Sequence, residues 1–357
     1  MKLNKFYPKL DSLRAIAVIL VIISHWFSSQ HFINRYTSNG TIGVTLFFVL
    51  SGFLITGILI NYKVQLAKKK RGFINALKVF YWRRTLRIFP IYYLLLSIVI
   101  LFKLAAIHDA FWWHFVYASN FYFWIQGSFQ GPFSHFWSLA IEEQFYLIWP
   151  LLILIVPIRR YMILFLTAIL TAFLFRLMSI TESNEMSRFL LLGSIDSFAI
   201  GALFALVHKG ILTIPNKWKE VRMQSQLGIG FFIVSQSLMY LPLSRNWYLA
   251  VYLCLLSCSF GWMILAACRK NEATTNPNLL NNRILIYLGK ISYGLYLYHN
   301  FIPCFYGLNL SWIPAEFSLY VVQFIRFSVL LFVASVSWYF IEKPMLKLKN
   351  SFTIDNL

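Results

Sequence analysis

Long apolar runs alternate with short polar segments along almost the whole chain. A helix needs about 20 apolar residues to cross a bilayer core of about 30 Å, and most of these runs reach that length. Backbone groups inside hydrocarbon must satisfy their own hydrogen bonds, so such runs predict helices. We predict about ten membrane-spanning helices, over residues 10–30, 41–60, 87–106, 136–156, 161–178, 189–207, 226–241, 247–267, 284–306 and 315–340.

The composition agrees with this pattern. Hydrophobic residues make up 59% of the 357 residues and charged residues 12%, whereas a soluble domain has about 25% charged residues. We therefore expect an all-α, polytopic helical membrane protein, with one transmembrane domain over residues 1–345. Residues 346–357 are expected to form a short cytoplasmic tail.

Basic residues are concentrated in alternate loops, and the chain carries a net charge of +20. By the positive-inside rule, this asymmetry places both termini in the cytoplasm and explains the charge without a nucleic-acid partner. The expected cytoplasmic segments hold bases at Lys2, Lys5 and Lys9, nine from Lys63 to Arg87, Arg159, Arg160, four over 209–222, Arg269, Lys270, Arg283, Lys343, Lys347 and Lys349. The opposite side holds Arg35, Arg188 and Arg245, with Lys103 at the end of a span.

The first apolar run contains three ionisable residues, Asp11, Arg14 and His25. Each such group costs about 2.5 kcal/mol or more in hydrocarbon, so its presence indicates function. Arg14 and His25 are eleven positions apart, which is about three helical turns or about 16 Å along one face. With the N-terminus in the cytoplasm, Arg14 lies near the cytoplasmic surface and His25 beyond the middle. A long, thin substrate could reach both.

A second group of cations follows the second span. Apolar residues at helical spacing predict an interfacial helix within residues 61–87, at Phe73, Leu77 and Phe80. Arg84 and Arg87 lie at i and i+3 beside the entry to the third span. Two guanidiniums in this arrangement could bind a phosphate, and anchoring to lipid headgroups is the alternative.

The start of the fourth span carries His135, Ser138 and Glu142 on one helical stripe, followed by Glu143. The stripe superficially offers a Ser/His/acid triad, but no nucleophile elbow or oxyanion donor accompanies it. Adjacent carboxylates entering a membrane are costly. At least one of the two glutamates is therefore expected to face a polar cavity or an arginine.

Two later spans also contain ionisable residues. Asp196 in the sixth span needs a buried partner, for which Arg176 and Arg326 are candidates. It adjoins a small-residue seam for close helix packing, at Gly193, Ser197 and Gly201. His299 in the ninth span fits either a packed structural histidine or a site residue. We expect no metal site, because the four cysteines have no metal-ligand spacing (Cys254, Cys258, Cys268 and Cys304).

The segment over residues 107–135 is rich in aromatic residues and contains no Lys or Arg. An aromatic belt at the membrane interface explains most of it. A platform for a sugar or an isoprenoid lipid is the alternative.

Six of these stretches, taken together and in order, resemble the acyltransferase 3 family of bacterial inner-membrane enzymes. They are Leu10–Ala17 followed by His25, Gly43–Ile55, Arg83–Pro90, Trp137–Tyr146, Ser292–His299 and Glu342–Pro344. One departure is Ser12, where the family often has glycine. Ser12 fits the start of a helix, so we expect little effect from it.

The resemblance implies transfer of an acyl group, usually acetyl, from cytoplasmic acetyl-coenzyme A to a periplasmic carbohydrate. It implies essential roles for Arg14 and His25 and for the Arg84–Arg87 pair. No fused SGNH-type esterase domain is present in this sequence, so it resembles the stand-alone members, which act unaided or with a separate periplasmic partner. A surface polysaccharide is the expected acceptor, with lipopolysaccharide O-antigen favoured.

These residues suggest a mechanism. Arg84, Arg87 and Arg14 would hold the coenzyme phosphates, and His25 would act as a general base or carry the acyl group briefly. Asp11 could orient Arg14, and Glu142 could orient His25 or the acceptor, while Glu143, Asp196 and His299 are possible supporting residues. No permanently bound cofactor is expected, and membrane lipids are expected neighbours. A transporter or flippase for an acyl group or glycolipid is the rival interpretation.

Overall fold

The computed structural model describes residues 7–69, 72–102, 110–179, 185–269, 279–302 and 315–348. Every regular element within these residues is a helix, which confirms the predicted fold class. Six helical segments are long and apolar enough to cross a membrane, so the chain is a multi-pass membrane protein. These are Asn39–Ala67, Phe73–Leu101, Phe136–Ile155, Ile158–Ser179, Arg245–Cys268 and Ser318–Leu348. The count of ten spans stays a prediction.

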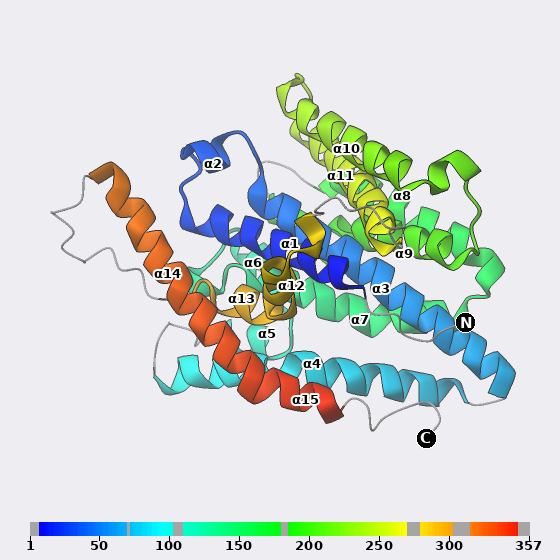
Figure 1. The fold of residues 1–357 in the computed structure, drawn as a ribbon, viewed down its shortest axis with the longest axis horizontal. Helices are drawn as coiled ribbons and strands as arrows, with labels where there is room; N and C mark the ends of the chain where they lie inside the picture. The colour runs from blue at the N-terminus through cyan, green and yellow to red at the C-terminus, as the bar shows by residue number, and fades with distance from the viewer. Residues whose placement is uncertain are drawn as a thin grey trace.

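Helix α3 (Asn39–Lys69) lies at the centre of the molecule (Figure 1). It packs against α1 (Pro8–Trp26), α7 (Phe136–Ile155), α9 (Ile195–Lys209) and α11 (Arg245–Cys268). Its 31 residues correspond to about 46 Å at 1.5 Å per residue, which exceeds the thickness of a bilayer core. A helix of this length can therefore pack against different helices at different points along its length.

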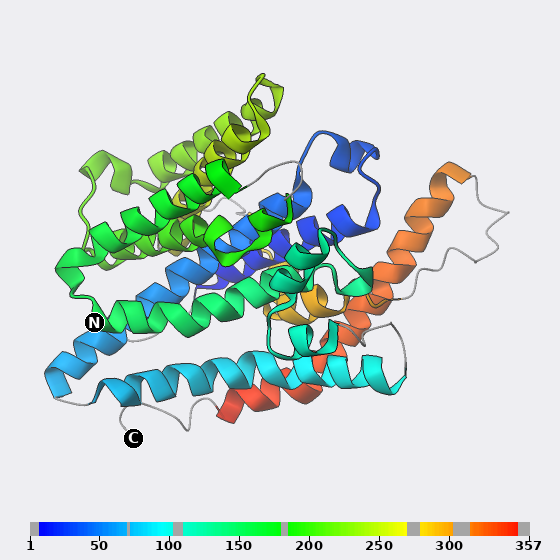
Figure 2. The same ribbon diagram turned by 180° about the vertical axis from the view of Figure 1, so that it is seen from behind.

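The other helices lie on two sides of this centre. Helices α4 (Phe73–Leu101), α14 (Ala315–Ser337) and α15 (Lys343–Leu348) lie along one edge, where α15 packs on α4 (Figures 1 and 2). Helices α8 (Tyr161–Ser179), α9, α10 (Val221–Ser237) and α11 form the opposite side. The short helices are α2 (Phe32–Arg35), α5 (Phe111–Phe115), α6 (Ser119–Gln126), α12 (Arg283–Lys290) and α13 (Ser292–Tyr298).

The helix predicted within residues 61–87 is not separate from the third span, although a separate helix was expected. Helix α4 begins at Phe73 and continues through Pro90 to Leu101 without a break. Ala76, Val79 and Phe80 are buried in the protein core. Helical spacing of apolar residues correctly indicated a helix. Of the three residues that carried the prediction, Phe80 is buried, Leu77 is half-buried and Phe73 is exposed.

The ninth predicted span is interrupted within its described part. Helices α12 and α13 meet at Ile291, where the chain leaves regular α-helix. Just before this break, Gly289 lies against the backbone of α1. A Cβ added at Gly289 would be 1.8 Å from the carbonyl oxygen of Asp11, so only glycine permits this approach.

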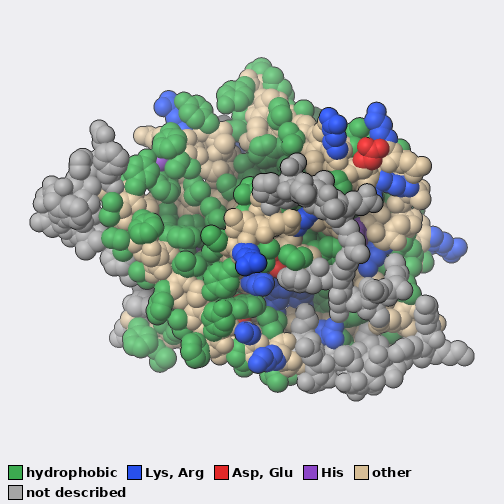
Figure 3. Space-filling model, in the orientation of Figure 1, with side chains coloured by type: hydrophobic (Ala, Val, Ile, Leu, Met, Phe, Trp, Pro, Cys, Tyr) green, Lys and Arg blue, Asp and Glu red, His purple; other side chains and the backbone are tan. Residues whose placement is uncertain are grey.

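The ends that the loop charges predict to be cytoplasmic lie on one side of the molecule in both ribbon views. They are the start of α1, the end of α3, the start of α4 and the end of α15 (Figures 1 and 2). The last turn of α9 has polar contacts with two other elements: the Tyr7 hydroxyl, just before α1, lies 3.1 Å from His208 Nε2, and Lys209 Nζ donates to Asn61 Oδ1 of α3 at 2.8 Å. Lys and Arg side chains gather toward the same side and near the centre of the face in Figure 3, and hydrophobic side chains cover much of the rest.

The α3–α9 crossing depends on glycine from both helices. A Cβ at Gly52 would be 2.0 Å from the carbonyl oxygen of Phe198, and a Cβ at Gly201 would be 2.2 Å from that of Val49. Ser197, one turn before Gly201, lies 2.9 Å from Ser257 Oγ on α11. The predicted small-residue seam thus contacts two neighbouring helices.

Replacement of Gly52 by alanine is expected to destabilise the protein by about 1–3 kcal/mol, because the added methyl group overlaps the α9 backbone. Thermal unfolding of the detergent-solubilised protein measures the effect. The control is Gly57→Ala on the same helix, where the nearest atom to a Cβ is Lys209 Cε at 3.8 Å. Equal melting temperatures for the two variants would contradict the close crossing.

Candidate active site

Two cavities adjoin in the centre of the helix bundle. The first, called here the arginine cavity, has a volume of about 80 Å³. Its charged lining residues come from three helices: Arg14 from α1, Arg84 and Arg87 from α4, and Glu142 and Glu143 from α7. The structure therefore brings together five of the residues that the sequence singled out, although these lie far apart along the chain.

Arg14 is held by its predicted partner. Its Nη1 atom lies 2.6 Å from Asp11 Oδ1, one turn earlier on α1, and its side chain keeps 19% of its surface exposed. This pairing fixes one end of the guanidinium and leaves the rest directed to the cavity. The role predicted for Asp11, orienting Arg14, agrees with this contact.

The carboxylate of Glu142 faces the same cavity, as at least one of the two glutamates was expected to do. Ser51 Oγ of α3 donates a hydrogen bond of 2.8 Å to Glu142 Oε1 and lies 3.0 Å from the Tyr146 hydroxyl. The guanidinium carbon of Arg84 is 4.8 Å from the centre of the Tyr146 ring. A cation–π contact of this kind stabilises the position of an arginine and leaves its N–H donors available for other hydrogen bonds.

Arg84 and Arg87 line the arginine cavity without a carboxylate partner among the residues that the structure describes. In the described part of the chain, neither guanidinium lies within 4 Å of a carboxylate oxygen. Each has five N–H donors in a planar fork, and the two lie one helical turn apart on one face of α4. This arrangement can bind phosphate oxygens.

The second cavity, called here the histidine cavity, is larger, at about 430 Å³. The His25 side chain at the end of α1 is exposed into it. Its polar and aromatic lining comes from loops and several helices, and includes Thr41, Thr45, Phe129, Ser134, Trp137, Arg188, Phe189 and Tyr296. Aromatic faces together with hydroxyl groups are a combination that binds sugars.

His25 lies in a group of three histidines. Its ring centre is 5.0 Å from that of His299 and 6.4 Å from that of His135, and both of these residues are fully buried. Asn300 Nδ2 lies 3.5 Å from His25 Nδ1 and 3.1 Å from His135 Nδ1. In the described residues, no group of three or more His, Cys, Asp or Glu side chains could hold a metal ion.

The partners of the two buried histidines assign their ring protons. His135 Nε2 lies 3.2 Å from the carbonyl oxygen of Leu297, and His299 Nδ1 lies 2.6 Å from that of Tyr296. Since a carbonyl only accepts, each of these nitrogens carries the proton when the ring is neutral. His299 Nε2 is then a free lone pair, and it has no hydrogen-bond partner among the residues that the structure describes.

The serine triad considered from the sequence is not formed. Ser138 Oγ donates to the backbone oxygen of His135 at 3.1 Å and contacts the Tyr296 hydroxyl. The His135 ring instead bonds Leu297 and Asn300. Ser138 therefore lacks the general base that nucleophilic attack would need.

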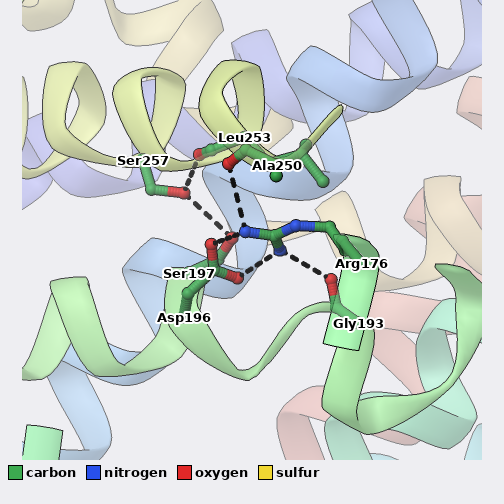
Figure 4. Close-up of polar contacts among 7 residues, drawn as sticks. All are labelled: Arg176, Gly193, Asp196, Ser197, Ala250, Leu253 and Ser257. Atoms are coloured by element: carbon green, nitrogen blue, oxygen red, sulfur yellow. Dashed lines mark hydrogen bonds and ion pairs between the residues drawn. The ribbon is translucent and has the colours of Figure 1, made fainter. Parts of the chain in front are cut away.

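Asp196 pairs with Arg176, the first of its two candidate partners, in a buried network that joins α8, α9 and α11 (Figure 4). Arg176 donates to both carboxylate oxygens, at 2.9 and 2.6 Å, and to the carbonyl oxygens of Gly193 and Ala250. Arg326 instead lies over the Trp26 ring at 4.2 Å. Both Asp196 carboxylate oxygens and both terminal nitrogens of Arg176 have partners inside the protein, which favours a structural role for Asp196.

Three residues with notable positions were missed by sequence reasoning. Tyr296 lines both cavities, Ser51 bonds Glu142, and Asn300 contacts His25. Each lies within or next to a stretch that carried the family resemblance, but none is charged. The aromatic segment before α7 also contributes to both cavities, Tyr117 to the first and Phe129 to the second.

Comparison with known proteins agrees with this geometry. Two proteins named O-acetyltransferase OatA, from Staphylococcus aureus strains NCTC 8325 / PS 47 and COL, are each 27% identical to the chain over 370 aligned positions and cover 96% of it. The chain spans 58% of the length of each of these relatives. No solved structure matches the chain. The acyltransferase 3 family model, described as an acyltransferase domain, matches residues 7–341, which include every helix that lines the two cavities, and the chain therefore belongs to this family.

Proposed function

We propose that this protein is a membrane O-acetyltransferase that moves an acetyl group from acetyl-coenzyme A to a hydroxyl group of a surface polysaccharide. The observation that carries the proposal is the placement of three arginines in one cavity and of His25 in the adjoining one. The names of the staphylococcal relatives support the reaction type. Phosphates of the coenzyme would bind Arg84, Arg87 and Arg14, and the thioester would extend toward His25.

The reaction uses His25 as a base. The hydroxyl oxygen of the acceptor attacks the thioester carbonyl, the new C–O bond forms and the C–S bond breaks. His25 accepts the hydroxyl proton and returns it to the departing thiolate, so that the products are an acetyl ester and free coenzyme A. If His25 instead carries the acetyl group, rapid quenching followed by mass spectrometry will detect an acetylated peptide containing His25.

The orientation and the acceptor belong to the same proposal. Both termini face the cytoplasm of a bacterium, the protein lies in its cytoplasmic (inner) membrane, and the histidine cavity faces outward. Loop charge supports this orientation. Lipopolysaccharide O-antigen is the first acceptor to test, and capsule, exopolysaccharide and lipid-linked sugars come next. If the protein alone does not complete the transfer, we propose that a separate periplasmic protein is its partner.

The test uses the purified protein in liposomes, with acetyl-labelled coenzyme A on one side and a candidate glycan on the other. Label bonded covalently to the glycan supports the acetyltransferase. Movement of label or glycolipid across the membrane without a new ester would overturn the proposal in favour of a transporter. Mass spectrometry of surface glycans from cells with and without the protein identifies the acceptor.

The double replacement Arg84→Ala with Arg87→Ala is expected to raise the KM for acetyl-coenzyme A by about tenfold or more, because each charge-assisted hydrogen bond contributes about 1.5–3 kcal/mol. Initial rates at varied donor concentration measure it. The matched control is Arg83→Ala, since Arg83 bonds the Tyr62 hydroxyl at 3.1 Å and does not line the cavity. An unchanged KM in the double variant would favour anchoring to lipid headgroups.

A further inference from the structure

We infer that Tyr296, together with Val44 and Phe48, forms a junction between the arginine cavity and the histidine cavity and sets the length of the acyl group that can pass. The inference rests on the proposed acyl transfer, because it identifies the residues that select the donor. Tyr296, Val44 and Phe48 are the residues that line both cavities in the described part of the chain. Any group carried from the arginines to His25 must therefore pass between them.

One side of the junction is the Tyr296 ring from α13. Its side chain is 5% exposed, its hydroxyl donates to the carbonyl oxygen of His135 at 3.2 Å, and it also contacts Ser138 Oγ. Phe47 packs edge-on against the ring, with the centres 5.9 Å apart. Contacts at both the hydroxyl and the ring hold Tyr296 in one position between the cavities.

The opposite side comes from α3 and is also fixed. The Phe48 ring stacks on Phe198 at 4.6 Å between centres and meets the Trp137 ring edge-on at 6.2 Å. Val44 lies one helical turn before Phe48, and both are buried. Close-packed side chains resist displacement, so the width of the junction is set by the size of these three residues.

The sizes of the two cavities indicate where selection occurs. The arginine cavity is about 80 Å³, against about 430 Å³ for the histidine cavity. An acyl group that moves from the arginines toward His25 reaches Tyr296 while it is still in the smaller arginine cavity. An acetyl group adds one methyl group beyond the carbonyl, whereas each further methylene must fit against the Tyr296 ring. A pocket can discriminate by about tenfold or more for each methylene.

The first experiment measures kcat/KM for acetyl-, butyryl- and hexanoyl-coenzyme A. Two variants widen the junction from opposite sides, Tyr296→Leu and Val44→Ala. Both are expected to raise the butyryl-to-acetyl ratio about tenfold or more. The control is Tyr298→Leu, the same change on the same helix, because Tyr298 bonds Ser337 and lines neither cavity. An unchanged ratio in whichever widened variants fold would overturn the inference.

A second experiment does not depend on activity. Ser292 lines only the arginine cavity, so a Ser292→Cys variant, with the four native cysteines replaced by serine, reports access to it. A small charged thiol reagent is added from each face of the membrane separately. We expect labelling from one face when Tyr296 is present and from both faces after Tyr296→Leu.

The outcomes separate the two proposals. Equal labelling from both faces with Tyr296 present would overturn the junction, whatever the activity. If labelling is one-sided but the wild-type protein forms no acyl ester from any of the three donors, the proposed reaction fails while the barrier between the cavities remains.

Discussion

Replacing His25 with alanine is expected to reduce acetyl transfer by about 10²–10⁴-fold, the usual contribution of a positioned general base, without loss of folding. The His25 side chain is exposed and lines the histidine cavity, and His135 and His299 beside it are buried. One ring nitrogen of each bonds a backbone carbonyl, whereas the His25 ring lines the cavity. The variant therefore removes the base without exposing an unpaired group in the core.

Ester formation from labelled acetyl-coenzyme A measures this prediction, with membrane insertion and melting temperature checked in parallel. The matched control is His31→Ala, because His31 packs against Phe27 and Tyr320 and lines neither cavity. It should retain near-wild-type activity. Full activity in the His25→Ala protein would eliminate both proposed routes, base catalysis and acyl transfer through the imidazole.

Replacing Asp196 with alanine is expected to lower the free energy of unfolding by about 3–5 kcal/mol, because it leaves the Arg176 charge buried without its counter-ion. Both side chains of the pair are completely buried, and Arg176 Nη2 lies 2.6 Å from Asp196 Oδ2. The penalty arises from the stranded guanidinium more than from the lost bond. Denaturant titration of the detergent-solubilised protein measures it.

The chain contains a suitable control for this change. Arg245 and Glu185 form an ion pair whose side chains are 51% and 38% exposed, so Glu185→Ala should cost only about 0–1 kcal/mol. The double variant Arg176→Met with Asp196→Leu should recover much of the loss, since it removes both charges. If Asp196→Ala proves no more destabilising than Glu185→Ala, the buried pair does not stabilise the bundle.

The sequence alone was most informative where ionisable residues occur within or beside apolar runs. Asp11, Arg14 and the two glutamates are charged residues in or beside apolar runs. Arg14 and both glutamates line one cavity, and Asp11 holds Arg14. Asp196 required a buried partner for the same reason. The free-energy cost of placing an ionisable group in hydrocarbon depends on the residue type, so it can be estimated from the sequence alone.

The sequence did not reveal what the apolar residues pack against. Phe80 at helical spacing predicted a helix correctly, but periodicity does not distinguish lipid from a packed helix, and α4 continues through the predicted interfacial segment. Tyr296 was read as part of an apolar span, because an aromatic residue between two cavities has the same pattern as one in a core. The break at Ile291, within the span predicted over residues 284–306, was likewise not predicted.

The contact between Gly289 and Asp11 predicts which substitutions at position 289 abolish function. Gly289 has no functional group, yet any side chain there displaces the backbone of Asp11, whose carboxylate holds Arg14. A saturation screen for lost function should therefore recover every substitution at Gly289, alanine included, with the same phenotype as substitutions at Arg14. Distant suppressors of a Gly289 lesion should map to α1, where small changes can restore room for the added atoms.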